Sequence, residues 1–175
     1  MRLHQLSVGF DPEQDRLLMR IATSTQSEFR LWLTRRYVKL LWPALLQLVD
    51  STAPPAARAP SQATPQAQQA VRAFAHEEAI SRADFSKPYE ADERETPLGA
   101  DPILLSRMET GTNAAGQRLL SMHPREGQGV NLTLDPVLLH SLLRMIHAAA
   151  KKADWQLALT LPETSPAPGP NALVN

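Results

Sequence analysis

The hydrophobic pattern of the chain changes its period twice, at Thr34 and again at Asp135. Before each point apolar and polar residues alternate, which is typical of a strand with one buried face. After each point apolar residues recur every three or four positions, as on one face of a helix. Thr and Asp both favour helix N-caps, because their side-chain oxygens accept a backbone N–H. The sequence therefore predicts two strand-to-helix junctions, at positions 34 and 135 and hence 101 residues apart.

Alternating segments precede each junction, and an apolar helical stripe follows it. The predicted strands are 3–10, 16–23 and 28–33 in the first half, and 103–110, 117–123 and 130–134 in the second. The first predicted helix contains Pro43, which removes a backbone hydrogen bond and predicts a bend near Lys39. Residues 155–161 alternate as well, and this pattern predicts a closing strand.

This order predicts an α+β fold in which two pseudo-symmetric β-β-β-α units pack as one domain. At the offset of the two junctions, Leu31 corresponds to Leu132 and Leu41 to Leu142. One helix cannot comfortably cover a three-stranded sheet, so we expect the two units to share a core. The predicted boundaries are 1–50 for the first unit, 51–100 for a helical Pro/Ala-rich insert, 101–161 for the second unit and 162–175 for a disordered Pro-rich tail.

The insert itself divides into three predicted parts. Residues 51–63 are rich in Pro and small side chains, which cannot bury enough surface to become ordered, and we interpret them as a linker. Thr64 and Pro65 resemble an N-cap followed by proline at the first helical position, and they predict a helix that continues to about Arg82. Residues 84–97 are mostly acidic among their charged positions, and we expect an exposed acidic loop.

Composition excludes several classes of function. The chain carries 18 basic and 18 acidic residues, so it lacks the bulk attraction of a basic protein for nucleic acid or anionic membranes. It contains no cysteine, which excludes disulfides, thiolate catalysis and cysteine-based metal sites. No apolar run approaches the ~20 residues that span a bilayer. We therefore expect a soluble, cytoplasmic protein with no membrane partner.

The sequence also lacks recognisable catalytic or metal-binding motifs. His76 begins a segment like the helical His-Glu-x-x-His zinc motif, but Ile80 stands where the second histidine is needed, so we expect no metal site there. His140 and His147 are two helical turns apart and share a face with Arg144 and Lys151, which predicts a basic, solvated face. No Gly-rich phosphate loop or nucleophile elbow can be identified. We accordingly expect no enzyme and no cofactor.

The most distinctive candidate is a patch of cations and large apolar residues around the first junction. Strand alternation places four of its members on the face opposite the predicted core, and the other three follow on the helix. The patch comprises Leu18, Arg20, Arg30, Trp32, Arg35, Arg36 and Lys39. Cations interleaved with an aromatic side chain can hold a phosphate backbone and stack a base. The same residues could instead form an apolar seam with an Arg rim between two protein chains, since Trp and Arg are enriched at interfaces.

The repeated order of strands followed by a helix resembles the Whirly and PUR-type single-stranded nucleic-acid binders. The resemblance is one of topology and covers both predicted units. It implies binding of single-stranded DNA or RNA by a sheet face. Both of those groups carry four strands before each helix, whereas three are predicted here.

Three functional hypotheses follow. The leading one is a non-catalytic binding or scaffold protein that acts through protein–protein contacts, with self-association. The alternative is a single-stranded nucleic-acid binder that uses the basic and aromatic patch. The third is a small-molecule sensor with a pocket between the two units.

Overall fold

The computed structural model describes residues 3–52, 65–82, 89 and 93–162. These residues form two sheets and three helices, so the expectation of a mixed α+β fold is confirmed. The first sheet contains β1 (Leu3–Asp11), β2 (Arg16–Thr23), β3 (Glu28–Leu33) and β4 (Ile103–Leu104). The second contains β5 (Arg107–Thr112), β6 (Arg118–His123) and β7 (Val130–Leu134). The helices are α1 (Arg35–Thr52), α2 (Pro65–Ser81) and α3 (Pro136–Lys152).

The first sheet has one face turned to the core, as the alternation predicts. β1, β2 and β3 pair antiparallel in sequence order, with Leu18 opposite Trp32 and Arg20 opposite Arg30. The inward positions of β2 and β3 are fully buried, with the exception of Phe29, which is half-buried. The fully buried residues are Leu17, Met19, Ile21, Leu31 and Leu33. Burial of each such side chain contributes about 1.5–3 kcal/mol.

The segment predicted as one strand over residues 103–110 is two strands in two different sheets. β4 pairs parallel with β3, whereas β5 pairs antiparallel with β6. Between them the Leu105 N–H donates to the Trp32 carbonyl, and the Ser106 N–H donates to the His123 carbonyl. Consecutive residues therefore bond to different sheets, and the chain crosses from one sheet to the other at this point.

Both predicted helix caps are present. The Tyr37 N–H donates to the Thr34 hydroxyl at 3.1 Å, and the Leu138 N–H donates to the Asp135 carboxylate at 2.8 Å. α1 is a single helix that contains Pro43 and ends at Thr52. Among the described residues, none of the helices has the length and apolar content needed to cross a membrane.

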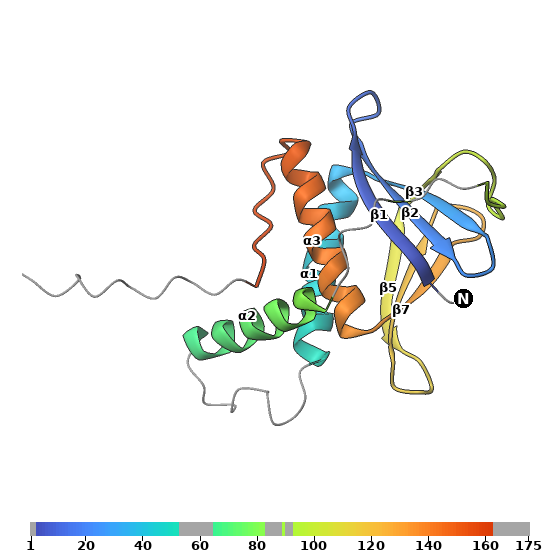
Figure 1. Ribbon diagram of the computed structural model, residues 1–175. Helices are drawn as coiled ribbons and strands as arrows, with labels where there is room; N and C mark the ends of the chain where they lie inside the picture. The colour runs from blue at the N-terminus through green and yellow to red at the C-terminus, as the bar shows by residue number, and fades with distance from the viewer. Residues whose placement is uncertain (1–2, 53–64, 83–88, 90–92, 163–175) are drawn as a thin grey trace, which may run out of the picture.

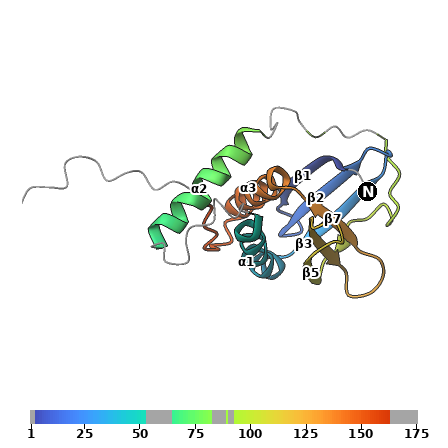
Figure 2. The ribbon, with the colours of Figure 1, turned by 90° about the horizontal axis from the view of Figure 1, so that it is seen from below.

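The helices form two layers on one side of the sheets. Figures 1 and 2 show α1 and α3 side by side against the sheets, with α2 beyond them. α3 packs on β1 and β2 of the first sheet, whereas α1 contacts β5 of the second. The Tyr37 hydroxyl reinforces the latter contact by donating to the Arg107 carbonyl at 3.2 Å. Each of these helices thus contacts the sheet of the other half, and both halves contribute to one hydrophobic core.

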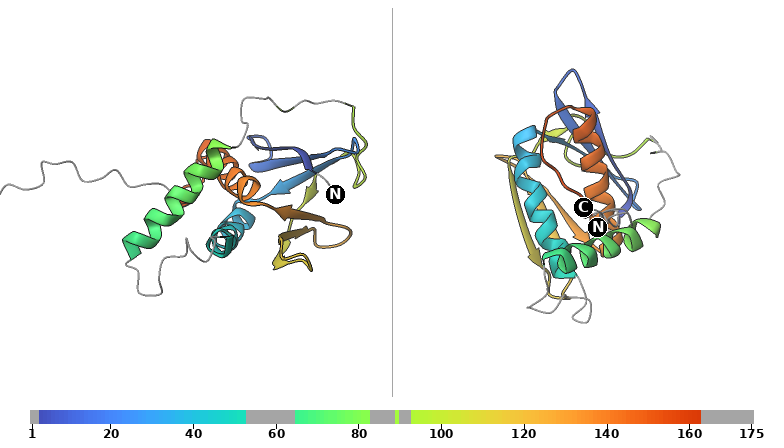
Figure 3. Two further views of the ribbon diagram at one scale, coloured as in Figure 1. Left: turned by 60° about the horizontal axis from the view of Figure 1, so that its bottom comes forward. Right: turned by 90° about the vertical axis from the view of Figure 1, so that its left-hand side faces the viewer.

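The insert is only partly described by the structure. α2 begins at Pro65, as predicted, and crosses the ends of α1 and α3 (Figure 3). The predicted cap Thr64 and most of the predicted linker lie outside the described residues. Of the predicted acidic loop, Glu95 pairs its backbone with the chain around β3. Its N–H donates to the Gln26 carbonyl, and its carbonyl accepts the Glu28 N–H.

The closing strand predicted over residues 155–161 is absent, because this segment joins no sheet in the described chain. Asp154 and Gln156 have φ angles of 50° and 53°, in the left-handed region that interrupts a strand. The Leu159 N–H donates to the Leu157 carbonyl, which is a local bend rather than a ladder bond. The alternation nevertheless has a structural basis, because Leu157, Leu159 and Leu161 pack against the core.

Candidate functional site

The structure divides the predicted binding patch into two groups. Leu18, Arg20, Arg30 and Trp32 lie on the outer face of the first sheet and are half-buried. The remaining members lie on the first turns of α1 and are exposed; they are Arg35, Arg36 and Lys39. The two groups have different surroundings.

The sheet-face group surrounds a buried acid that the sequence analysis missed. Glu28 is 4% exposed and forms an ion pair with Arg30. The Tyr89 hydroxyl donates to its other carboxylate oxygen at 2.6 Å. Burial raises the pKa of the Glu28 carboxyl, but hydrogen bonds from Tyr89 and Arg30 outweigh it and lower the pKa below its ordinary value. Alternation along β3 could have revealed this residue, since positions 28 and 30 share a face.

Both arginines of the sheet face have partners within the chain. The Arg20 guanidinium lies 5.8 Å from the centroid of the Tyr89 ring, a cation–π geometry. The Arg30 guanidinium donates to the Ala100 carbonyl at 3.2 Å in addition to its pairing with Glu28. Both guanidinium groups of this face therefore contact residues of the insert.

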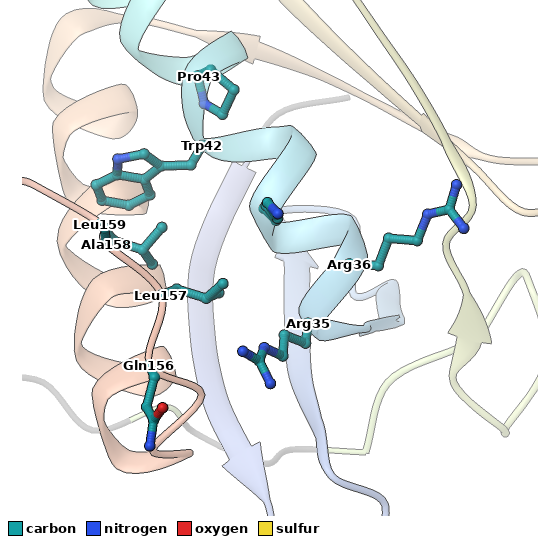
Figure 4. A pocket seen from close by; sticks show the side chains of 9 residues that line it. Arg35, Arg36, Trp42, Pro43, Gln156, Leu157, Ala158 and Leu159 are labelled. Atoms are coloured by element: carbon teal, nitrogen blue, oxygen red, sulfur yellow. The ribbon is translucent and has the colours of Figure 1, made fainter.

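The helix group lines a groove of about 820 Å³ between α1 and residues 156–159. Figure 4 shows the Arg35 side chain directed toward the segment that carries Leu157, whereas Arg36 points to the other side of α1. Lys39 lines the same groove one turn further along the helix. None of the described residues that line it is acidic; the lining is Arg35, Arg36, Lys39, Trp42, Pro43, Gln156, Leu157, Ala158 and Leu159.

The floor of the groove is apolar. Trp42 is 5% exposed, and its ring lies 6.3 Å from that of His147. Its indole N–H is buried, and no atom of the described residues accepts a hydrogen bond from it. Leu157 and Leu159 add half-buried aliphatic surface opposite it.

Trp155 holds the far wall of the groove in place. Its ring is 4% exposed and meets Phe10 edge to face at 6.2 Å. Its indole N–H donates to the Asp15 carboxylate at 2.7 Å. The left-handed backbone on both sides of Trp155 then directs the following residues along α1. The turn between β1 and β2 therefore positions a wall of the groove through a contact 140 residues apart in sequence.

The α1 side of the groove is positively charged. The N-terminus of a helix carries partial positive charge and free N–H groups. The first turn of α1 holds no acidic residue to offset that charge, and Arg35 and Arg36 add to it. Cations at this end of a helix destabilise it. The start of α1 therefore carries positive charge that no acidic residue of its first turn offsets.

The histidines differ from the prediction of a solvated basic face on α3. His140 is 2% exposed, and its Nδ1 lies 2.8 Å from Nδ1 of His76, which is 7% exposed. The prediction was wrong for His140 because α2 covers that part of α3. Burial and the charge of His76 lower the pKa of His140 to about 4. No sequence signal could have paired these residues, which are 64 positions apart.

Comparisons with protein-family models, curated proteins and solved structures found no match for the chain. The likeness to the Whirly and PUR-type proteins therefore rests on the order of elements alone. The order of elements does not determine function, which depends on the residues of a site.

Proposed function

We propose that the chain is a non-catalytic binding protein that takes an acidic polypeptide segment in the groove between α1 and residues 156–159. The observation that carries the proposal is the combination of a cationic rim with an apolar floor, without an acid among the described lining residues. Carboxylates of the partner would meet Arg35 and Lys39, while its apolar side chains would cover the half-buried Leu157 and Leu159. A volume of about 820 Å³ is within the usual range for a ligand site and accommodates a few side chains.

A polypeptide fits the groove better than single-stranded nucleic acid does. Sequence-tolerant binding of single strands relies on aromatic faces on which bases stack. Trp42 and Trp155 are buried at 5% and 4% exposure, and Trp32 is half-buried on the opposite side of the first sheet. The cations of the sheet face are already paired with Glu28 and Tyr89. Aliphatic surface flanked by cations instead suits a segment in which acidic and apolar residues alternate.

A fluorescence-anisotropy titration tests this proposal. The probe is a short labelled peptide in which Glu and Leu alternate, with a Lys–Leu peptide of equal length and a labelled single-stranded oligonucleotide in parallel. We expect the acidic peptide to bind and to weaken as salt rises, because opposite charges near the surface are screened. Arg35→Glu and Lys39→Glu should each reduce its affinity about tenfold, since each places an acid where the partner needs a cation.

The matched control is Arg125→Glu, which makes the same charge change at an exposed position outside the α1 groove. It should leave the affinity for the acidic peptide near that of the unaltered protein. Equal losses of peptide affinity in Arg35→Glu and Arg125→Glu would show an effect of net charge alone. They would contradict binding in the groove. Tighter binding of the oligonucleotide than of the acidic peptide would replace the proposal with the nucleic-acid alternative.

We also propose that the two halves of the molecule are copies of one β-β-β-α unit. The proposal is supported by two antiparallel three-stranded runs, β1–β3 and β5–β7, each followed by a helix, and by N-caps at Thr34 and Asp135. Leu41 and Leu142, which correspond under the same offset, are both fully buried in the shared core.

A further inference from the structure

β1 is the terminal strand of the first sheet, and its outer edge pairs with no strand of the described chain. Its register shift against β2 lies between Leu3 and Gln5, and the pairing is regular from Gln5 to Asp11. The edge of a strand presents a row of backbone N–H and C=O groups with which another strand can pair. The regular part of β1 is as long as a typical strand. β1 therefore offers a full-length edge for one further strand.

The sequence of β1 does nothing to prevent such pairing. Natural proteins usually protect an edge strand with charged side chains, proline or a bulge. The stretch from Gln5 to Phe10 contains no charged residue and no proline, and the register shift lies before it. Its outward side also has room, because no atom of the described chain lies within 4 Å of the position that a Cβ on Gly9 would take.

The core-facing side of β1 is incompletely covered. β7, the strand that ends the second sheet, provides the comparison, since its three inward side chains are only 2–3% exposed. The inward side chains Leu6, Val8 and Phe10 of β1 remain half-buried, although α3 packs on this strand. A further strand at this edge would add apolar side chains to the same face and complete its burial.

We propose that β1 pairs antiparallel with β1 of a second copy of this chain, across a twofold axis at Val8. In this register Val8 lies opposite Val8 of the second copy, and Leu6 lies opposite Phe10, so apolar side chains meet on the core face. On the outer face Ser7 lies opposite Gly9 of the second copy. The two four-stranded sheets then form one continuous sheet.

The second copy is the partner that suits this strand because the pattern is self-complementary. A twofold interface brings the same surface of each subunit together, so any charge near the axis faces a like charge. The uncharged stretch from Gln5 to Phe10 avoids this repulsion. None of the described residues that line the α1 groove comes from β1. The pairing and the proposed binding of an acidic segment can therefore succeed or fail independently.

Light scattering of the full chain over a series of concentrations tests the pairing. We expect the unaltered protein to have twice the mass of one chain at micromolar concentrations and above. Ser7→Glu combined with Gly9→Glu should give single chains at the same concentrations, because each new carboxylate lies opposite another across the axis. Within one chain the changes are compatible with the fold, since position 7 lies opposite Arg20 and position 9 has open space.

The matched control is Asn131→Glu combined with Thr133→Glu, which adds the same two charges at exposed positions of β7. It should keep the mass of the unaltered protein. A single-chain mass for the unaltered protein throughout the series would overturn the proposal. So would a dimer that the β1 double variant leaves intact, or one that both double variants disrupt equally.

Val8→Cys reads out the register without a change of charge and decides the question if the β1 double variant does not fold. The chain has no cysteine, so the new thiol can form a disulfide only with that of another copy. Residues directly opposite in antiparallel strands have Cβ atoms about 4.5–5.5 Å apart, close to the separation in a disulfide. We expect mild oxidation to link Val8→Cys chains in pairs and to leave Thr133→Cys chains single. No linked pairs from Val8→Cys, or an equal yield from Thr133→Cys, would contradict the pairing.

Discussion

The two strand-to-helix junctions form the same cap with opposite electrostatics. At α3, the Asp135 carboxylate accepts the Leu138 N–H, Pro136 follows, and Lys151 and Lys152 occupy the last turn. This arrangement complements the helix dipole at both ends. At α1, the neutral Thr34 hydroxyl provides the cap, Arg35 and Arg36 follow, and the last turn has no basic residue. The charges of α1 therefore oppose its dipole.

Equivalent positions along the two helices carry the contrast further. The position of Lys39 in α1 corresponds to His140 in α3 under the offset of the two caps. Lys39 is exposed in the groove, whereas His140 is buried under α2. The difference teaches that the same pattern of apolar residues leaves equivalent polar positions exposed in one helix and buried in the other. The charges of the second junction favour its helix, whereas those of the first oppose its helix and form a cationic surface.

The largest predicted effect tests whether the two halves of the molecule unfold together. Leu41→Ala and Leu142→Ala remove equivalent, fully buried side chains and should each lower the free energy of unfolding by about 3 kcal/mol. Because both residues belong to one core, each variant should unfold in a single transition in urea. Two separate transitions, with only one shifted by each variant, would show that the halves have independent cores.

The next largest effect is the dependence of stability on pH that the buried His140 should cause. The unfolded His140 takes up a proton near pH 6.5, whereas the folded one does so only near pH 4. Stability should therefore be full above pH 6.5 and should fall as the pH drops toward 4, with a loss of about 2 kcal/mol by pH 5. Urea denaturation between pH 7 and pH 5 measures it.

The matched variants separate His140 from the other acids and bases of the chain. His140→Gln should flatten the difference between neutral pH and pH 5, because the group that takes up the proton on unfolding is gone. Lys39→Gln, the corresponding change on the exposed face of α1, should keep the profile of the unaltered protein. An unchanged slope in His140→Gln would mean that another group causes the acid sensitivity.

A smaller effect compares the caps themselves. Asp135→Ala removes both the bond to the Leu138 N–H and a favourable charge, so it should cost about 1–2 kcal/mol. Thr34→Ala removes the bond to the Tyr37 N–H alone and should cost about 1 kcal/mol or less. Chemical denaturation of both variants checks this order. The reverse order would contradict the electrostatic difference between the junctions.

The smallest effect is a gain. Thr34→Asp gives α1 the cap of α3 and places a carboxylate beside Arg35 and Arg36, so stability should rise by about 0.5 kcal/mol. The same carboxylate should weaken binding of the acidic peptide a few-fold, because it competes for the cations of the groove. A variant that gains stability and keeps its affinity for the acidic peptide would show that the charge at the start of α1 does not contribute to the proposed binding.

Local patterns predicted the elements well where one face is buried and turn chemistry is explicit. Alternation located β1, β2 and β3, and the side chains of Thr34 and Asp135 marked the starts of α1 and α3. The same alternation misled at residues 155–161. A segment that packs every second residue against the core has the alternating pattern of a strand, whether or not its backbone pairs with a sheet.

The candidate sites needed long-range contacts that no local pattern contains. The groove exists because Trp155 reaches Asp15 and brings Leu157 beside α1. The histidine pair exists because α2 crosses α3. Glu28 is an intermediate case: its face could be inferred from the strand period, but its partner Tyr89 could not.

By itself, the sequence determined the mixed class of fold, the two capped junctions and the inward faces of β2 and β3, because these depend on period and on side chains a few positions apart. Only the tertiary structure decided which cations remain in solvent, which are paired with Glu28, and which histidine is covered. The physical reason is that burial and charge pairing depend on neighbours in space. Those neighbours are set by how two helices and two sheets pack, which no spacing along the chain specifies.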